Sequence, residues 1–473
     1  MGETSPGKFK PNPALPRRTG AEQPPSERVR NFSEVALGLS AEDAASEASR
    51  CLQCKNAPCI AACPVNIDIP SFIARLRAGD PASAAAKIME SSLLPAICGR
   101  VCPQETYCEN ACVLNKPGRF KPVAIGRLER FAADEARRLK TLQAPKPAAA
   151  TGRKIACVGS GPASLSAAAE LRRRGHEVAV YEALHEFGGV LRYGIPSFRL
   201  PREIIRAEVE TLREMGVRFI ADVLVGRTLT VSELLQAYDL VFVGSGAGLP
   251  TMMDVPGENL VGVYSANEFL TRVNLMRADR FPLSDTPVYV GRRVLVVGGG
   301  NSAMDAARCA MRLGPESVSI LYRRSRVEMP ARAEEIDHAQ EEGVRFEFLC
   351  APVSLEGDEQ GRLVRARCVR MRLGEPDAGG RRRPETIPGS EFVVEAESLI
   401  TAIGQSPNPI IQQTTPGLTV QKRGTLQACE DGRTSVGRIY AGGDVVRGGA
   451  TVLLAMKDGK TAAAAMDRLL REG

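Results

Sequence analysis

Three patterns of apolar and polar positions follow one another along this 473-residue chain. Residues 1–30 contain six prolines and few large apolar side chains, which is typical of an extended, partly mobile arm. Residues 31–145 show the apolar spacing of helices, with Ser40 placed to cap one helix and others expected at 70–76 and 81–89. Beyond a proline-rich and alanine-rich linker, short apolar runs alternate with helical patterns, which indicates parallel strands joined by helices.

The alternating part contains two units in which a strand, a glycine-rich turn and a helix precede a second strand. The first unit has strands at 154–158 and 177–181, and the second has strands at 293–297 and 318–321. Such β-α-β units, about thirty residues long, build the doubly wound sheets that bind nucleotides. An alanine-rich helix at 453–470 closes the chain. The predicted fold class is therefore α/β, with an all-helical N-terminal domain followed by two Rossmann-like domains.

Composition and charge exclude several classes of protein. Apolar residues make up 44% of the chain and charged residues 25%, as in ordinary globular proteins, so the chain as a whole is not disordered. Apolar runs are shorter than the ~18 residues of a membrane helix, and the N-terminal residues lack the pattern of a secretory signal. The net charge of +7 is mild and spread out, so it favours an acidic partner or phosphates over nucleic acid.

Eight of the thirteen cysteines fall between Cys51 and Cys112, and the other five are scattered. Clustered cysteines without a secretory signal argue against disulfides and for a reducing compartment, which predicts a cytoplasmic protein. The runs read C-x2-C-x4-C-x3-C-P, then C-x3-C-P and C-x3-C. A cysteine before a proline is familiar from bacterial ferredoxins, and eight thiolates suffice for two 4Fe-4S clusters. Zinc is the alternative, but the segment has a single C-x2-C pair and no histidine.

A G-x-G-x-x-S turn follows the first strand of the first unit and opens its helix. The first glycine makes the turn, and the second lets the backbone approach a pyrophosphate at the helix N-terminus. Glu182, at the end of the next strand, can accept hydrogen bonds from an adenosine ribose. These residues predict a dinucleotide site formed by Gly159, Ser160, Gly161, Pro162, Ala163 and Glu182.

The second unit repeats the arrangement as G-x-G-x-x-A, but its second strand is followed by Arg323 and Arg324 instead of an acid. A carboxylate at this place would repel a 2′-phosphate, whereas a guanidinium can bind it in bidentate fashion. NADP is therefore favoured over NAD, the alternative being that both arginines are ordinary surface charge. The predicted binding residues are Gly298, Gly300, Asn301, Ser302, Arg323 and Arg324.

The acid after the first unit and the arginines after the second together predict FAD in the first domain and NADPH in the second. Two further strands that run into glycine turns, at 400–405 and 439–444, support this interpretation. Asp444 can bind a ribityl hydroxyl, and the helix after Thr451 can direct backbone N–H groups at the flavin pyrimidine edge, unless it is a plain core helix. Further cofactor contacts are expected at Gly189, Arg192, Gly246, Gly404, Gly443, Asp444, Thr451 and Val452.

In this order, the motifs resemble the family of the small (beta) subunit of NADPH-dependent glutamate synthase. The resemblance rests on the cysteine runs, the two glycine-rich turns and the segments 322–324, 401–405 and 441–444, and it covers the chain from about residue 30. It extends to the large subunit of NADH-dependent ferredoxin:NADP oxidoreductase, to sulfide dehydrogenase and to the N-terminal half of dihydropyrimidine dehydrogenase. The motifs identify this superfamily but separate its members poorly.

The resemblance implies a thioredoxin-reductase-like arrangement in which an FAD domain (151–285 and 408–473) is interrupted by an NADPH domain (286–407), behind a helical domain (31–145) with two 4Fe-4S clusters. It assigns the ligands as Cys51, Cys54, Cys59 and Cys112 for one cluster, and Cys63, Cys102, Cys108 and Glu129 for the other. Sequence spacing alone would select Cys98 as the eighth ligand, so Cys98 competes with Glu129.

The resemblance also implies a function, in which NADPH reduces FAD and electrons pass singly through the clusters to a partner subunit. Such a reaction depends on orientation more than on acid–base groups, so no catalytic residue is expected. The alternatives are an NADP-binding subunit of a bifurcating ferredoxin:NADP oxidoreductase or a sulfide dehydrogenase, and a scaffold or redox sensor with the same fold. We expect neither nucleic acid nor a membrane as partner, and we expect His338, in an acidic stretch, to be solvated.

Overall fold

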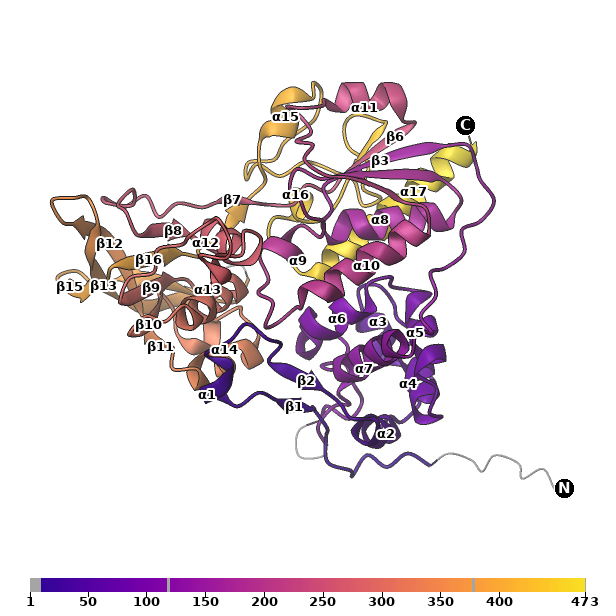
Figure 1. Cartoon of the computed structure of the whole chain (residues 1–473), viewed down its shortest axis with the longest axis horizontal. Helices are drawn as coiled ribbons and strands as arrows, with labels where there is room; N and C mark the ends of the chain where they lie inside the picture. Colours follow the sequence, from indigo (N-terminus) through magenta and orange to yellow (C-terminus); the bar gives the residue numbers. More distant parts are fainter. Residues whose placement is uncertain (1–9, 117–119, 377–378, 473) are drawn as a thin grey trace.

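The structure, a computed structural model, describes residues 10–116, 120–376 and 379–472. Figure 1 shows a helical domain and two α/β domains. Each α/β domain is built on a five-stranded sheet. The helical domain lies below the first α/β domain, and the second α/β domain lies to the side (Figure 1). This arrangement confirms the predicted fold class. No helix in the described part of the chain is long and apolar enough to cross a membrane.

The helical domain is built from short helices, most of which have proline in one of their first two positions, where the missing N–H is not needed. Ser40 accepts a hydrogen bond from the backbone N–H of Asp43, which confirms the predicted cap. The elements are α2 (Ala41–Ser49), α3 (Pro58–Ala62), α4 (Ile69–Arg77), α5 (Pro81–Met89), α6 (Pro95–Val101), the 3-10 turn η1 (Gln104–Thr106) and α7 (Ile125–Arg138).

The first α/β domain has a parallel sheet in the order β18-β6-β3-β4-β5, with α8 and α17 packed closely together on it. Gly459 permits this packing, since a Cβ there would lie only 2.1 Å from the Ala163 carbonyl oxygen. The strands are β3 (Lys154–Val158), β4 (Glu177–Tyr181), β5 (Arg218–Ile220), β6 (Leu240–Val243) and β18 (Ile439–Ala441). The helices are α8 (Pro162–Arg173), α9 (Val190–Tyr193), α10 (Arg202–Glu214), α11 (Val231–Ala237), α15 (Ile410–Thr414), α16 (Asp444–Arg447) and α17 (Val452–Glu472).

The second α/β domain has a parallel sheet in the order β11-β10-β9-β16-β8 and a smaller antiparallel sheet. Its parallel strands are β8 (Val263–Ser265), β9 (Arg293–Val297), β10 (Ser317–Tyr322), β11 (Arg345–Phe348) and β16 (Ser398–Thr401). Its helices are α12 (Ala266–Asn274), α13 (Asn301–Arg312) and α14 (Ala333–Glu341), with 3-10 turns η2 (Ala278–Arg280) and η3 (Arg326–Glu328). The antiparallel strands are β12 (Cys350–Gly357), β13 (Leu363–Pro376), β14 (Arg382–Thr386) and β15 (Phe392–Glu395).

The border between the two α/β domains lies earlier in the chain than residue 286, where the sequence placed it. Strand β8 pairs with β16 and therefore belongs to the second sheet. The chain passes between the domains along a two-stranded antiparallel ribbon of β7 (Leu249–Pro250) and β17 (Gln405–Ser406). The backbone N–H of Thr251 donates to the carbonyl of Gly404 at 3.0 Å beside this ribbon.

The segment before the helical domain is not a free arm over its whole predicted length. Strand β1 (Ala21–Glu22) pairs with β2 (Ala36–Gly38), and α1 (Pro25–Arg28) lies between them in the chain. Figure 1 shows this segment running between the helical domain and the second α/β domain. Arg28 is only 2% exposed, and His338 is 7% exposed with its Nε2 atom 3.0 Å from Glu22. The expectation of a solvated His338 was therefore wrong, because β1 covers it.

Candidate functional site

Four of the predicted ligands, Cys51, Cys54, Cys59 and Cys112, line one cavity. All four are half-buried. Burial and then repulsion by its neighbouring thiols raise the pKa of Cys59 to about 12, and burial also raises the pKa of Cys51. A bound cation would reverse this penalty, so the donor set fits a metal centre. The other lining residues are Leu52, Ala57, Pro58, Ile69, Pro70, Ile73, Val113, Leu114, Val123 and Ile125.

A second group lies deeper in the helical domain. Cys63 follows α3, Cys102 follows α6 and Cys108 follows η1, and these three are only 5%, 3% and 6% exposed. Burial raises the pKa of each, and Glu129 on α7 adds repulsion to all three. Cys63 also contributes to the raised pKa of both Cys102 and Cys108, so these charges lie close together.

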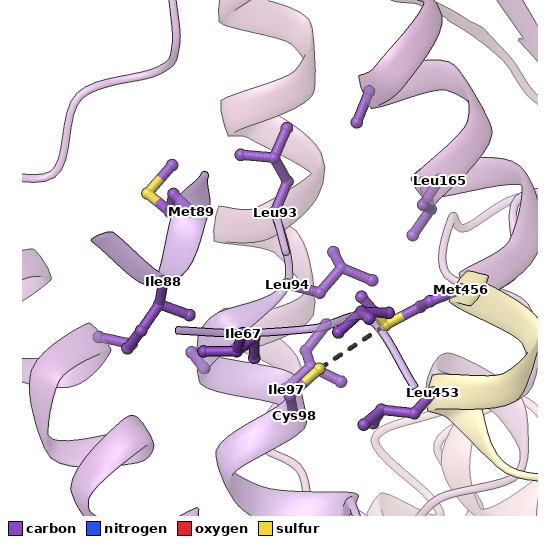
Figure 2. Close-up of a cluster of buried hydrophobic side chains, with 14 of the residues drawn as sticks. Ile67, Ile88, Met89, Leu93, Leu94, Ile97, Cys98, Leu165, Leu453 and Met456 are labelled. Carbon is purple, nitrogen blue, oxygen red and sulfur yellow. Dashed lines mark hydrogen bonds between the residues drawn. The ribbon is translucent and has the colours of Figure 1, made fainter. Parts of the chain in front are cut away.

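Glu129 and Cys98 lie in the same region, but only Glu129 has an atom that could bind a metal and that lacks a partner among the described residues. Burial raises the pKa of Glu129 to about 8, and its Oε1 atom has no hydrogen-bond partner among the described residues. The Cys98 sulfur lies 3.6 Å from Met456 Sδ and 3.9 Å from Ser92 Oγ. Figure 2 shows it directed at Met456 within a cluster of aliphatic side chains. An unpartnered buried carboxylate fits a cation ligand, whereas Cys98 is packed as a core residue.

The second cysteine group is joined to the first α/β domain by contacts that sequence reasoning missed. The hydroxyl of Tyr107, next to Cys108, lies 3.1 Å from the hydroxyl of Thr451. Thr451 immediately precedes α17, and its Oγ1 accepts a hydrogen bond from the backbone N–H of Leu454. The N-terminal end of α17 therefore lies beside the second cysteine group. A local pattern could not have signalled Tyr107, because its partner is 344 residues away.

The predicted FAD turn has the geometry that its glycines require. Gly159 has φ +86°, and a Cβ at Gly161, the N-cap of α8, would meet no atom within 4 Å. Glu182 accepts hydrogen bonds from Ser160 N at 2.8 Å, Ser160 Oγ at 2.5 Å and Leu184 N at 2.9 Å. Glu182 thus holds the turn, and the open space before α8 fits a pyrophosphate.

Residues from three further segments meet this turn. A Cβ at Gly189, which has φ +53°, would lie 2.9 Å from Gly161 Cα, and one at Gly443 would lie 2.9 Å from Ala163 Cβ. Burial raises the pKa of Asp444 to about 6. The Asp444 carboxylate accepts a hydrogen bond from Ala450 N at 3.2 Å. These contacts bring the N-terminal ends of α8, α9 and α16 together. Helix α17 reaches the same place, since a Cβ at Gly443 would lie 3.4 Å from Ala455 Cβ.

Two other predicted residues of the first domain differ in their surroundings. Arg192 on α9 donates from Nη2 to Glu186 at 2.8 Å, while its buried Nε has no partner among the described residues. Gly246, after β6, has φ +73° and open space around it. Tyr193 was not predicted, yet burial and then the charges of Asp444 and Glu182 raise its pKa, so it lies near both acids.

The second glycine turn is formed as predicted, but its two arginines have different surroundings. Gly300 is the N-cap of α13, with no atom nearer than 4.0 Å to a Cβ built there. Asn301 and Ser302, the first residues of α13, are exposed beside it. Arg323 is exposed, whereas Arg324 is 7% exposed and donates from Nε to the Arg382 carbonyl at 2.8 Å. Arg323 is therefore the better placed of the two to reach a 2′-phosphate.

The packing of Gly298 explains why this position holds glycine. Gly298 has φ +145°, and a Cβ there would lie 2.3 Å from the Ala402 carbonyl oxygen, so any side chain would clash. Gly404 has φ +137° and lies at the ribbon between the domains, where a Cβ would approach Thr251 Oγ1 at 3.5 Å. The two turns thus meet the carboxyl ends of neighbouring strands β9 and β16, the edge at which such sheets bind ligands.

Comparisons with known proteins agree with this arrangement. Residues 28–141 match the family described as dihydropyrimidine dehydrogenase domain II, 4Fe-4S cluster, and residues 153–459 match pyridine nucleotide-disulphide oxidoreductase. Mycobacterium tuberculosis FprA in complex with NADPH has a similar fold (TM-score 0.58, 22% identity, 68% of this chain and 85% of that chain). Thioredoxin reductase of T. acidophilum does too (TM-score 0.50, 19% identity, 67% and 99%). Fold and site thus define an NADPH-dependent flavoprotein oxidoreductase that binds FAD and an iron–sulfur cluster.

Among curated relatives, the glutamate synthase [NADPH] small chain of Halomonas elongata is 38% identical over 451 residues, covering 94% of this chain and 95% of its own. The corresponding small chain of Escherichia coli K12 is 36% identical, covering 95% and 96%. The putative oxidoreductase AegA of the same organism is 38% identical, covering 92% of this chain and 67% of its own. The chain belongs to the glutamate synthase small-chain family.

Proposed function

We propose that this chain is the electron-input subunit of a larger enzyme of the glutamate synthase type. In this proposal it takes electrons from NADPH and delivers them, through FAD and two 4Fe-4S clusters, to a separate subunit. The observation that carries the proposal is the division of the ligands into two groups, one half-buried and one buried beside the FAD domain. The proposed clusters need reduced cysteines as ligands, which is consistent with a cytoplasmic location.

Each group has its own set of residues in the proposal. Cys51, Cys54, Cys59 and Cys112 hold one cluster, and we call these four the outer group. Cys63, Cys102, Cys108 and Glu129 hold the other, and we call these four the inner group. The outer group lines one cavity, and the pKa values of Cys59, Cys102 and Glu129 are raised in these two groups. Two separate sets of four donors support two 4Fe-4S clusters.

The nucleotide domains position the reactants. When bound, FAD and the clusters supply hydride acceptance from NADPH and one-electron transfer onward. Gly161 and the N-terminal end of α8 bind the FAD pyrophosphate, Glu182 binds the adenosine ribose and Asp444 binds the ribityl chain. Gly300 and α13 bind the NADPH pyrophosphate, and Arg323 binds its 2′-phosphate. No residue of the chain needs to move a proton to carbon, so orientation and charge are what the protein supplies.

The electron acceptor separates this proposal from a second one. The chain is 38% identical to the NADP(+)-dependent formate dehydrogenase subunit beta of Moorella thermoacetica, covering 88% of this chain but only 60% of that protein. The NADPH-Fe(3+) oxidoreductase subunit beta of Geobacter sulfurreducens is 37% identical, covering 88% and 64%. These relatives favour, as the alternative, an NADP-binding subunit that serves another partner, such as a ferredoxin:NADP oxidoreductase or a sulfide dehydrogenase.

An anaerobic absorption spectrum with iron analysis tests the proposal directly. We expect about eight iron atoms per chain, and a flavin band over a broad background that bleaches with NADPH but not with an equal amount of NADH. A measured content of roughly four iron atoms per chain would mean that the chain holds one cluster and not two. Equal bleaching by NADH would mean that Arg323 does not select the phosphate. Co-purification with a large amidotransferase-type subunit would support the glutamate synthase type over the alternative.

A further inference from the structure

The outer group faces the surface, and the inner group does not. The cavity lined by Cys51, Cys54, Cys59 and Cys112 is bordered otherwise by apolar side chains, among them Val113, which is 38% exposed. All of the inner group is less than 9% exposed. If the proposed function holds, a partner protein can approach the iron–sulfur chain most closely at the outer group. The surface around that cavity is therefore where the chain would recognise a partner protein.

The two segments that supply the outer group carry charge of one sign. Residues 51–62 and 111–123 contain lysines but neither aspartate nor glutamate. The lysines Lys55, Lys116 and Lys121 are exposed, and none of them forms a salt bridge within the described parts of the chain. The backbone of Lys116 pairs with that of Phe120 in an isolated antiparallel β-bridge, and the Phe120 side chain is 37% exposed. A band of lysines thus accompanies exposed apolar side chains beside the cavity.

Neighbouring elements do not cancel this charge. Asp68, which precedes the cavity-lining residue Ile69, lies 3.4 Å from Lys87. Glu109, three residues before Cys112, is buried and paired with Arg17. Glu47, four residues before Cys51, is buried and paired with Arg50. Glu47, Asp68 and Glu109 are therefore each engaged by a cation of this chain. The lysines are left as the charges that a partner meets.

We propose that Lys55, Lys116 and Lys121, together with Val113 and Phe120, form a docking surface for an electron-transfer protein with an acidic face. We call this surface the lysine rim. The lysines would attract acidic side chains over several ångströms and orient the approaching protein. Val113 and Phe120 would form the dry contact at the centre, where water is excluded between the two redox centres. This inference rests on the proposed function and adds to it the chemistry of the partner.

The test uses the full-length holoprotein and, as probe, an acidic two-cluster bacterial ferredoxin. The rim variant is K55E/K116E/K121E, and the matched control is K140E/K146E/K422E, which changes net charge equally at exposed lysines elsewhere. We expect the rim variant to bind the probe at least about tenfold more weakly at low salt, and the control variant to stay within about twofold of the unsubstituted protein. The difference should shrink as salt is added, because the attraction is screened.

Two results would overturn the inference: equal weakening by both variants, or no binding of the probe by the unsubstituted protein at low salt. Iron content and the thermal unfolding midpoint of each variant show that its fold and clusters are intact. Bleaching of the flavin band by NADPH is measured in parallel. If bleaching occurs in every variant while the rim has no effect, the docking surface is wrong and the proposed function stands. If the unsubstituted protein does not bleach, the proposed function itself fails.

Discussion

At the residue scale, the contrast between Glu129 and Cys98 shows that residue type and burial do not by themselves identify a ligand. Both side chains are buried in the helical domain, and the charge of Glu129 contributes to the raised pKa of Cys98. They differ in their partners, since the Cys98 sulfur contacts Met456 and Ser92 whereas Glu129 Oε1 contacts no polar partner that the structure describes. A buried acceptor without a partner is costly unless something occupies it.

This contrast predicts opposite effects on iron content. Cys98→Ala should leave about eight iron atoms per chain and destabilise the fold by about 1 kcal/mol, because only a small core contact is lost. Glu129→Ala should lower the iron content towards about four, with loss of the electron paramagnetic resonance signal of one reduced cluster. Iron loss in the Cys98 variant with full content in the Glu129 variant would reverse the assignment.

The two arginines after β10 also differ in their expected effects. Arg323→Ala should raise the KM for NADPH by about 10- to 100-fold and leave the KM for NADH nearly unchanged, because it removes one charge-assisted contact to the 2′-phosphate. Arg324 is buried and bonded to the Arg382 carbonyl, so Arg324→Ala should lower the unfolding midpoint as well. Steady-state rates with both nucleotides measure this, and equal changes for NADH and NADPH would contradict it.

At the scale of elements, the C-terminal end of α14 is fixed by a buried ion network. Glu342, whose side chain is 0% exposed, accepts from Arg308 at 2.7 Å, Arg312 at 2.6 Å and Arg28 at 2.9 Å. Burial alone would raise the pKa of Glu342, but the hydrogen bonds from Arg308 and Arg312 outweigh it and lower the pKa from 4.5 to about 2. The network therefore joins α13, α14 and α1 through one carboxylate.

This lowered pKa predicts how stability depends on pH. Because the folded pKa lies below the unfolded value, Glu342 contributes about 3 kcal/mol above pH 4.5, and this is lost as pH falls towards 2. Glu342→Gln should lower the free energy of unfolding by about 3 kcal/mol or more at pH 7, since three buried arginines lose their shared counter-ion. Urea midpoints at pH 7 and pH 3 measure this, and the difference between the two proteins should shrink at pH 3.

Glu341 provides the matched control for that experiment. It is the neighbouring residue and also pairs with Arg28, but its side chain is 51% exposed. Glu341→Gln should change the free energy of unfolding by less than about 1 kcal/mol, because exposed ion pairs are screened by water. A loss as large as that of the Glu342 variant would mean that burial is not what gives the network its strength.

At the scale of the whole molecule, the segment from β1 to β2 connects the helical domain to the second α/β domain. Arg28 binds Glu342, and Val35 N donates to the Phe198 carbonyl at 2.9 Å, so the segment also reaches the first α/β domain. On the helical side, Arg130 Nη1 donates to the Ala36 carbonyl at 2.8 Å. The three domains are thus held in one arrangement by contacts outside their own cores.

Loosening the segment from β1 to β2 should change amide hydrogen exchange at residues far from the substitution. Arg28→Ala should raise amide hydrogen exchange in residues 21–38 and in α14 by at least roughly tenfold, because the segment loses its buried anchor. The exposed neighbour Arg30 serves as control, and Arg30→Ala should leave exchange unchanged. Exchange that rises in α14 alone, with residues 21–38 still protected, would show that the segment is held by its other contacts.

The sequence predicted the features that have local causes. Cysteine spacing predicted an iron–sulfur domain, and the family resemblance supplied the division of its ligands into two groups. The glycine turns, with Glu182 and Arg323, predicted two nucleotide sites, because each turn depends on residues near one another in the chain. Short strand β8 was missed because three residues show no pattern, so the domain border was placed too late. His338 was misjudged because its acidic helix looks solvated until β1 covers it. Tyr107 was missed because its partner Thr451 belongs to a distant segment.

The contacts between the two ends of the chain have a consequence for its synthesis on the ribosome. Arg28 cannot form its ion pair until Glu342 has been synthesised, 314 residues later. Tyr107 likewise cannot contact Thr451 until a further 344 residues have been made. Strand β18 is added to the first sheet only after the whole second α/β domain has been made. The nascent polypeptide therefore holds unburied apolar surface on β6 and α8 until translation is nearly finished. Its need for chaperones should be greatest in that interval, and premature termination before β18 should yield insoluble products.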